Sequence, residues 1–386
     1  MKAKERWWSN RFLKWRHGRL YLKDRPAVEI AAEYGTPLFV YSLDQIKENL
    51  KKLKKAFELF NVPELIIAYA MKANPHPEIL RCLLAEDCWI DAVSPGEVRE
   101  ALKAGFPGKK IIFTGTSLSE EDLKEVMFYP EIIINIDALE QLELMKKVRQ
   151  KFYPDQQYQV AIRWNPGIGR GFNSRTTTAG IRSPNGFPIK FGIEANQVIK
   201  VFKIAKQEGF IPIGLHQHLG SGWISRDWPI IKEGVRRMID KAVELIQLGF
   251  NLEFLDFGGG ISPRYEEKQK LFPLDKYAAF IFKKIKENQL PIKKIILEPG
   301  KFLVAEAGVL LTKVVYLKRS YGQIFVCVNA GTFNTVPRPA IYPEAYHHII
   351  NCLERKGRKK KVTIAGHLCE AGDIFGYDRL MSLPQP

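Results

Sequence analysis

Short apolar, β-branched runs recur along this chain, and each of them ends in turn residues. These runs cover residues 64–72, 88–94, 109–115, 131–137, 159–165, 210–218, 252–258 and 293–300. Helix-period patterns fill most of the gaps between them, and strands that alternate with helices build parallel sheets. Eight such units within about 240 residues predict a closed α/β fold, the (β/α)8 TIM barrel. A doubly wound open sheet is the alternative.

The alternation of strand-like and helix-like segments ends after residue 300. Three runs, 313–318, 323–329 and 361–365, are typical of strands but have no barrel-type helices between them. A further strand-like run at 19–23 precedes the barrel. We therefore expect three parts: residues 1–35, a segment that pairs with a β domain; residues 36–305, the barrel; and residues 306–386, a β-rich domain.

Composition restricts where such a chain works and what it binds. No apolar run approaches the roughly 20 residues that a membrane span requires. Five scattered cysteines fit reduced thiols better than a disulfide framework. The net charge of +17 is spread along the chain, and its densest basic cluster, 355–361, falls in a predicted loop rather than in a nucleic-acid-binding motif. We expect a cytoplasmic protein that binds neither a membrane nor nucleic acid.

Barrel enzymes carry their catalytic groups at the carboxyl ends of their strands. Lys72 stands at the end of the first predicted strand, after the apolar residues 65–69. Burial against apolar walls disfavours an ammonium, so we expect a lowered pKa and a nucleophilic amine. The carbonyl group of pyridoxal phosphate is the natural target of such an amine.

Two other strand ends fit the same cofactor. Gly258, Gly259 and Gly260 follow strand seven, where backbone N–H groups can converge on a phosphate. Glu298 ends strand eight, where a carboxylate can keep a pyridine nitrogen protonated. Plain turn glycines and a helix-capping glutamate are the structural alternatives.

The sixth strand ends in the sequence His-Gln-His-Leu-Gly-Ser-Gly, residues 216–222. His216 and His218 face the same side of a strand, which is also how a metal-dependent barrel hydrolase would present two ligands. Asp91 and Asp137 could complete such a metal site. The competing interpretation stacks a histidine on a pyridine ring and assigns Ser221 to a phosphate.

These segments together resemble the fold-type III pyridoxal-phosphate decarboxylases, most closely the diaminopimelate decarboxylases. Five segments carry the resemblance: YGTPLFVY at 34–41, YAMKAN at 69–74, DAVSPGE at 91–97, KFGI at 190–193 and the histidine segment at 216–222. The resemblance implies an alanine racemase-like barrel with a second β domain, pyridoxal 5'-phosphate as cofactor, and a homodimer. It also implies the conversion of meso-diaminopimelate, or a related diamino acid, to L-lysine or the corresponding amine.

The resemblance assigns roles to residues that match the family's motifs. The cofactor would be bound by Lys72, His218, Ser221, Gly258, Gly259, Gly260, Glu298 and Gly300. Arg338 and Tyr342, within RPAIY at 338–342, would bind a substrate carboxylate. Cys369 would return a proton to the substrate carbon after carbon dioxide leaves. Glu370 would hold the distal amino group, and both would reach into the partner subunit's site.

The sequence departs from the family at several positions. Lys301 stands where the family has arginine in its substrate site, which keeps the charge but loses the planar fork. Asn329 replaces an aspartate, so we expect a shifted substrate preference. The sequence stops at 383–386, before the family's glycine-alanine-tyrosine motif, so we expect a truncated β domain. A catalytically weakened or regulatory homologue is therefore the second functional hypothesis, beside the metal-dependent hydrolase.

Overall fold

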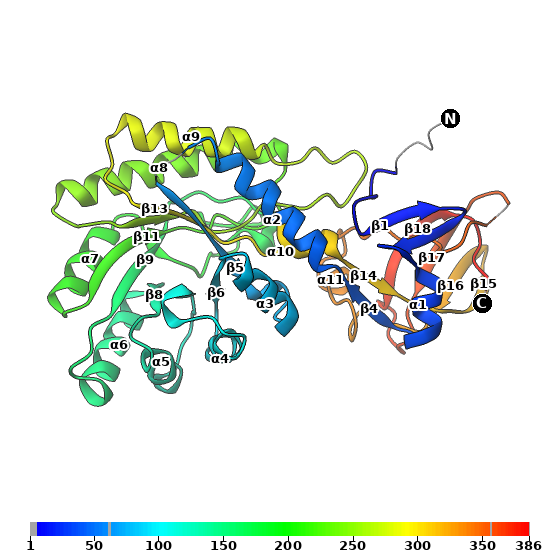
Figure 1. Cartoon of the computed structure of the whole chain (residues 1–386), viewed down its shortest axis with the longest axis horizontal. Helices are drawn as coiled ribbons and strands as arrows, with labels where there is room; N and C mark the ends of the chain where they lie inside the picture. Colours follow the sequence, from blue (N-terminus) through cyan, green and yellow to red (C-terminus); the bar gives the residue numbers. More distant parts are fainter. Residues whose placement is uncertain (1–5, 61–62, 356, 386) are drawn as a thin grey trace. The chain divides into compact units, whose positions relative to one another are not determined.

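Two compact units make up the computed structural model, which describes residues 6–60, 63–355 and 357–385 (Figure 1). Unit 1 takes the described residues of Met1–Ile46, Arg264–Gln269 and Glu306–Pro386, and unit 2 takes those of Lys47–Pro263 and Lys270–Ala305. This division differs from the predicted boundaries in two places. Residues 36–46 and 264–269, which we expected in the barrel, group with unit 1.

Eight parallel strands form a closed ring in unit 2. They are β5 (Glu64–Ala70), β6 (Trp89–Ala92), β7 (Ile111–Phe113), β8 (Ile133–Ile136), β9 (Gln159–Asn165), β11 (Ile211–His216), β12 (Phe254–Asp256) and β13 (Lys294–Leu297). Each pairs with the next along the chain, and β13 pairs with β5 to close the ring. A short strand, β10 (Ile193–Glu194), adds to β9. The predicted (β/α)8 barrel is confirmed, with one strand in each predicted run.

Apolar side chains fill the barrel interior. One buried cluster joins Ile66, Ala68, Ile112, Ile133, Ala161, Ile213, Phe254 and Ile296 from the barrel strands. Gly214 makes room for this packing, because a Cβ there would lie 2.2 Å from the Phe254 ring. The interior is therefore a packed core, and polar chemistry is restricted to the two mouths of the barrel.

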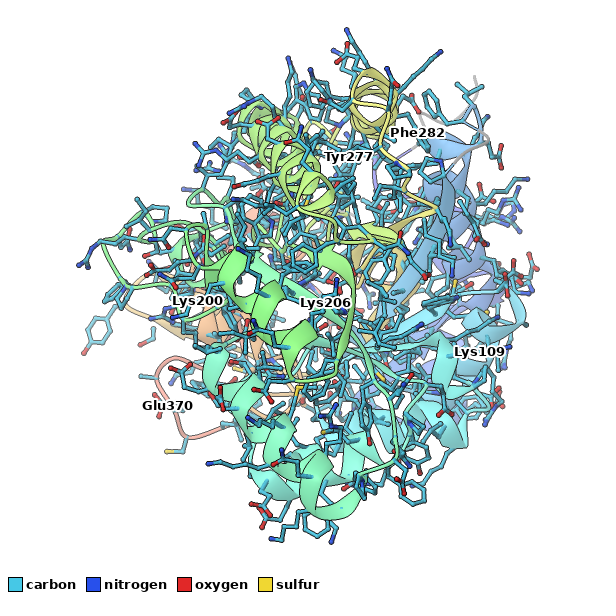
Figure 2. All side chains as sticks on the ribbon, turned by 90° about the vertical axis from the view of Figure 1, so that its left-hand side faces the viewer. Lys109, Lys200, Lys206, Tyr277, Phe282 and Glu370 are labelled. Atoms are coloured by element: carbon cyan, nitrogen blue, oxygen red, sulfur yellow. The ribbon has the colours of Figure 1, made fainter. Side chains whose placement is uncertain are left out.

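Helices cover the outside of the ring (Figure 1). They are α2 (Leu43–Phe57), α3 (Pro77–Ala85), α4 (Pro95–Lys103), α5 (Glu120–Met127), α6 (Leu139–Phe152), α7 (Val198–Gln207), α8 (Trp228–Gln247), α9 (Leu274–Glu287) and α10 (Lys301–Val304). The sequence Ser-Pro-Gly-Glu at 94–97 begins α4 as a helix cap: the Ser94 hydroxyl accepts the Glu97 N–H at 3.2 Å, and Pro95 occupies the first helical position. α9 buries Tyr277 and Phe282 against the barrel (Figure 2).

Unit 1 is rich in β structure, as predicted. A four-stranded sheet contains β15 (Val314–Ser320), β16 (Gln323–Val328), β17 (Lys360–Ala365) and β18 (Ile374–Met381). Three N-terminal strands, β1 (Leu13–Arg16), β2 (Arg19–Leu22) and β3 (Arg25–Pro26), form their own sheet, and α1 (Ala27–Tyr34) follows them. β4 (Leu38–Tyr41) pairs with β14 (Gly308–Leu311), and α11 (Arg338–Ile341) is a single turn. The strand predicted at 19–23 therefore pairs mainly with its N-terminal neighbours, although the Leu20 N–H also donates to the Cys352 carbonyl.

Asn329 has a structural explanation within unit 1. Its side-chain amide donates to the Thr36 carbonyl at 2.8 Å and accepts the Lys313 N–H at 2.8 Å. A carboxylate at this position could accept but not donate, and it would leave the Thr36 carbonyl without this donor. The asparagine is therefore explained by its backbone contacts, without reference to substrate preference.

Basic side chains are distributed over the surface. Lys109, Lys200 and Lys206 lie at separate positions on unit 2 (Figure 2). Of the basic cluster at 355–361, residue 356 lies outside the described residues, and Lys360 and Lys361 begin β17 rather than lying in a loop. The five cysteines are all free thiols. No helix within the described ranges is both long and apolar enough to cross a membrane.

Candidate active site

Lys72 and Asp91 meet at the carboxyl ends of two neighbouring barrel strands. Lys72 lies in a short 3-10 turn, η1 (Met71–Ala73), directly after β5, and Asp91 lies on β6. The register pairs Ala70 with Asp91, which brings the Lys72 Nζ within 3.2 Å of the Asp91 Oδ2. The Asp91 side chain is buried, whereas 53% of the Lys72 side chain is exposed. Lys72 is therefore accessible from the mouth of the barrel while it is anchored to a buried carboxylate.

The electrostatics of Lys72 differ from the prediction. Crowding by the surrounding protein lowers the pKa of Lys72, but the charges of Asp91 and Glu298 outweigh this effect and raise the pKa above its usual value. The expectation of a lowered pKa was wrong, because burial was considered without the carboxylates that neighbouring strands contribute. The structure holds Lys72 as an ammonium, so a proton must leave Nζ before the amine can act as a nucleophile.

Glu298 belongs to a buried cluster with His216 and Asp256. His216 Nε2 lies 3.2 Å from Glu298 Oε2, and ligand atoms of all three side chains lie within 4.8 Å of one another. Burial alone would raise the pKa of Glu298, but the hydrogen bond and charge of His216 help to lower that pKa to about 2. Burial and the charge of Glu298 raise the pKa of Asp256 well above its usual value. The cluster therefore favours an ionised Glu298 and, beside it, the protonated form of Asp256.

His218 follows β11 and carries a neutral ring. Its Nδ1 accepts the Gly259 N–H at 3.1 Å, so the ring proton lies on Nε2. Burial, together with the positive charge of Lys72, lowers the pKa of His218 to about 3. The ring can therefore stack on a flat ligand without adding a charge.

The three glycines after β12, residues 258–260, form a tight backbone turn with no room for larger side chains, which we call the glycine cradle. A Cβ on Gly259 would lie 2.2 Å from the Glu298 carbonyl oxygen, and a Cβ on Gly260 would lie 2.4 Å from the Gly220 oxygen. Gly258 and Gly260 also have φ angles of 67° and 121°, which other residues rarely adopt. Only glycine lets the backbone pass this close, and glycine-rich turns of this kind are typical of phosphate-binding loops.

The long loop after β9 fixes the segment that carries His218 and Ser221. The Arg170 N–H donates to the Leu219 carbonyl at 2.8 Å, and the Ser221 N–H donates to the Thr176 carbonyl at 2.9 Å. Thr178 Oγ1 donates to the His218 carbonyl at 2.9 Å. The loop therefore acts as a clamp on this segment.

Arg163 is a site residue that the sequence-based reasoning missed. It is buried on β9, and its guanidinium lies 3.4 Å from the Asp137 carboxylate, which follows β8. Its charge contributes to the lowered pKa of His218. The available signal was an arginine inside the apolar run 159–165, which requires a carboxylate partner when buried.

The remaining predicted residues lie in different places. Gly300 and Lys301 are in unit 2, where a Cβ on Gly300 would lie 3.1 Å from Ala73 Cβ. The other four predicted residues, Arg338, Tyr342, Cys369 and Glu370, are in unit 1. The Arg338 guanidinium donates to the Tyr346 carbonyl at 3.1 Å and lies 4.3 Å from the centre of the Tyr265 ring, which holds it in one orientation.

The hypothesis of a metal site on His216 and His218 finds little support in this geometry. Within the described part of the chain, the group compact enough for a cation is His216, Asp256 and Glu298, which does not include His218. The two proposed carboxylate ligands already face cations, Asp91 at Lys72 and Asp137 at Arg163. The same residues fit a flat, anionic cofactor better than a metal ion.

Known proteins are similar to this chain in sequence over most of its length. The model of the pyridoxal-dependent decarboxylase family, pyridoxal binding domain, matches residues 43–305. Diaminopimelate decarboxylase from Methanothermobacter thermautotrophicus is 36% identical over 94% of this chain and 82% of that protein. The Aquifex aeolicus enzyme is 34% identical over 96% of this chain and 84% of that protein.

Solved structures show the same fold. The crystal structure of diaminopimelate decarboxylase from Methanocaldococcus jannaschii is 32% identical, with a TM-score of 0.88, covering 97% of this chain and 86% of that one. The same enzyme in complex with L-lysine gives a TM-score of 0.86 at 33% identity, covering 97% and 85% of the two chains. The barrel, the glycine cradle and the lysine at its mouth thus occur in a chain that belongs to the pyridoxal-dependent decarboxylase family, with the diaminopimelate decarboxylases among its relatives.

Proposed function

We propose that this enzyme decarboxylates meso-diaminopimelate to L-lysine with pyridoxal 5'-phosphate bound at the carboxyl ends of the barrel strands. The observation that carries the proposal is the arrangement of Lys72, ionised Glu298 and the glycine cradle around one mouth of the barrel. The diaminopimelate decarboxylase relatives support the substrate, as does the L-lysine in the M. jannaschii complex.

The residues present fit the cofactor. The cradle of Gly258–Gly260, with the Ser221 hydroxyl, would contact the phosphate, and the Gly258 and Gly259 N–H groups hold the shape of the cradle by donating to Asp256 and His218. Lys72 would bind the cofactor covalently, Gly300 would leave room beside it, and the neutral His218 ring would stack on the pyridine. The ionised Glu298 would accept a hydrogen bond from the protonated pyridine nitrogen and so keep it protonated. When bound, pyridoxal phosphate supplies an electron sink for the electron pair that remains after the carboxylate leaves.

The protein's own groups prepare this chemistry. His216 keeps Glu298 ionised through its 3.2 Å contact, so the carboxylate can hold a pyridine proton. Burial and the charge of Glu298 raise the pKa of Asp256, which disfavours a second negative charge beside Glu298. Asp91 holds the Lys72 ammonium in place by a 3.2 Å contact. Each charged group that would contact the cofactor is therefore oriented by another buried side chain.

The substrate roles extend the proposal to unit 1. Arg338 and Tyr342 would bind a substrate carboxylate with Lys301, Glu370 would hold the distal amino group, and Cys369 would return the proton to the substrate carbon. Cys369 and Glu370 are both exposed on unit 1, as residues that act across a subunit interface need to be. We therefore propose a homodimer with shared sites.

The proposed organisation follows from these roles. Unit 2 would serve as the cofactor-binding domain, and unit 1 as the β-rich part that supplies substrate contacts. The five free thiols fit the cytoplasm as the place where the enzyme works.

Adding the cofactor to the purified protein tests the proposal directly. We expect a visible absorption band that is absent in the Lys72→Ala variant, and after borohydride reduction a modified peptide that contains Lys72. Carbon dioxide release from meso-diaminopimelate, with L-ornithine and L-arginine for comparison, then tests the substrate. A parent protein without the band would refute the cofactor assignment, and release from another diamino acid alone would refute the substrate.

Mixing two inactive variants tests the shared site. Lys72 and Cys369 lie in different units of the chain. If each site takes Lys72 from one subunit and Cys369 from the other, a mixed dimer of Lys72→Ala and Cys369→Ala contains one site in which both residues are native. Random mixing would restore about a quarter of the native sites if each site uses residues of both subunits. No recovery of carbon dioxide release, in a mixture shown to exchange subunits, would place all the residues of a site in one chain.

A further inference from the structure

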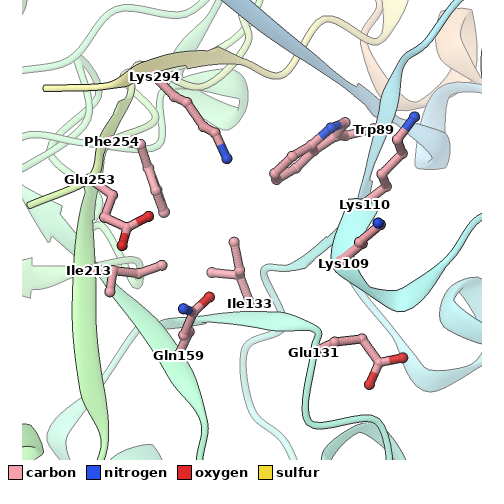
Figure 3. Close-up of a pocket in the computed structure, with 10 residues that line it drawn as sticks. All are labelled: Trp89, Lys109, Lys110, Glu131, Ile133, Gln159, Ile213, Glu253, Phe254 and Lys294. Carbon is pink, nitrogen blue, oxygen red and sulfur yellow. The ribbon is translucent and has the colours of Figure 1, made fainter. Parts of the chain in front are cut away.

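A cavity opens at the amino-terminal mouth of the barrel, opposite the mouth that carries Lys72. Its volume is about 240 Å³. It is lined by residues at the starts of several strands, including Trp89, Ile133, Ile213, Glu253, Phe254 and Lys294 (Figure 3). Phe254 begins β12, whereas Asp256 of the candidate active site ends it, so the two sites lie at opposite ends of the same strands.

The floor of this cavity is apolar. Ile133, Ile213 and Phe254 are each at most 5% exposed and belong to the buried barrel cluster, and Trp89 packs against that cluster. The floor is therefore rigid, because its side chains are also part of the packed interior. An aliphatic group placed on it would lose water contact without deforming the barrel.

The charged side chains that line the cavity include both lysines and glutamates, and in the described part of the chain they form no ion pairs with one another. Lys110 is neutralised by Asp87 at 2.5 Å. Across the described residues, no ion pair is formed by Lys294 or Glu253, and the Lys294 Nζ lies instead 5.2 Å from the Trp89 ring centre. Figure 3 shows the Lys294 amine reaching into the open centre, with Trp89 opposite it and Glu253 beside Phe254. Lys109 and Glu131 also line the cavity but are exposed to solvent, so Lys294 and Glu253 are the two partly buried charges, unpaired within the described chain, that border the apolar floor.

This combination selects one class of ligand. A polyanion would be repelled by Glu253, and an uncharged apolar molecule would leave Lys294 and Glu253 without partners. A zwitterion satisfies both charges, its carboxylate at Lys294 and its ammonium at Glu253. The volume lies below the roughly 300–1,000 Å³ of pockets for drug-sized ligands, which favours a single small molecule.

We propose that this cavity binds a free α-amino acid with an aliphatic side chain. The α-carboxylate contacts Lys294, the α-ammonium contacts Glu253, and the side chain lies on Ile133, Ile213 and Phe254. This site uses none of the residues assigned to the cofactor, so it stands apart from the proposed decarboxylation.

Calorimetric titration of the purified protein tests the zwitterion requirement. L-Leucine is the probe, and 4-methylpentanoate and 3-methylbutylamine are the matched ligands, because each keeps the aliphatic tail and loses one charge. We expect L-leucine to bind and each analogue to bind at least about tenfold more weakly, as expected for the loss of a hydrogen bond to a charged group. Equal affinity for either analogue, or no heat of binding with L-leucine, would overturn the proposal.

Four variants locate the binding site. Lys294→Met and Glu253→Gln keep the side-chain volume, and each should weaken L-leucine binding about tenfold. Lys200→Met removes an exposed lysine of α7, remote from the cavity, and should leave the affinity unchanged (Figure 2). Lys72→Ala should also leave it unchanged. Loss of binding in Lys72→Ala but not in Lys294→Met would assign L-leucine to the cofactor site and refute the proposal, while circular dichroism verifies that each variant is folded.

Discussion

Replacing Asp91 by asparagine should make Lys72 a better nucleophile toward the cofactor. The Lys72–Asp91 pair is one of the contacts that keep Nζ protonated, because an ionised carboxylate raises the pKa of a neighbouring amine. An asparagine side chain has nearly the same shape as the aspartate but carries no charge. The pKa of Lys72 should therefore fall, and a larger fraction of the amine should be neutral at any pH below that pKa.

The separation of the two charges sets the size of this effect. At 3.2 Å, two unit charges attract by about 1.3 kcal/mol at the dielectric constant of water and by about 5 kcal/mol at an effective dielectric constant of about 20. The Lys72 side chain is 53% exposed, so solvent screening favours the lower value. An energy of about 1.3 kcal/mol corresponds to about one pKa unit, or a tenfold change in the neutral fraction.

The assay is the rate at which pyridoxal phosphate attaches to the cofactor-free protein. Stopped-flow absorbance between about pH 7 and pH 9, below the pKa of lysine, should show attachment about tenfold faster in Asp91→Asn than in the parent protein. Asp87→Asn is the matched control, because Asp87 lies just before the same strand and pairs with Lys110 at its other end. An unchanged or slower rate in a folded Asp91→Asn protein would show that Asp91 does not control the Lys72 proton.

Three further substitutions follow from the same site. Gly259→Ala should lower the free energy of unfolding, measured in urea, by about 1–3 kcal/mol, because its Cβ would lie 2.2 Å from the Glu298 carbonyl oxygen. Gly96→Ala is the control and should not lower it, because a Cβ there has no contact below 3.6 Å. His218→Asn should reduce the loss of folding stability between about pH 6.5 and about pH 3. The pKa of His218 is about 3 in the folded protein and about 6.5 in the unfolded one, so protonation favours unfolding as the pH falls through this range. Urea titrations at several pH values measure how the free energy of unfolding changes with pH. Glu298→Gln should keep the absorption band but lower kcat for carbon dioxide release at least about a hundredfold, because the carboxylate acts on the electron sink rather than on attachment; a parent-like kcat would contradict this role.

The sequence predicted the barrel well because its signal is local. Each apolar run needs only its own β-branched residues and the turn that follows, and all eight runs contain a strand. The positions of Lys72, His218 and Glu298 at the barrel mouth follow from the same rule, since the carboxyl ends of parallel strands meet. The cap of α4 is similarly local, because the Ser94 bond needs only the sequence of residues 94–97.

The features that the sequence did not predict correctly depend on contacts between residues that are far apart in the chain. The pKa of Lys72 is set by Asp91 and Glu298, which are 19 and 226 positions away, so burial alone gave the wrong sign. Arg163 was missed because its partner Asp137 belongs to a different strand end. The role of Asn329 needs the carbonyl of Thr36, which is 293 positions away. Such pairings become visible only when the strand order and register are known.

The two mouths of the barrel use charge in opposite ways, and this difference predicts how each tolerates change. At the carboxyl end, Asp91 and Glu298 are buried and contact Lys72 and His216, so removing one partner would leave a desolvated charge. At the amino end, Lys294 and Glu253 are only partly buried, and no ion pair of the described chain uses them. Neutral substitutions there should cost little stability. A charge that folding does not require is free to serve recognition, which is why the amino-terminal cavity can bind a ligand without disturbing the catalytic mouth.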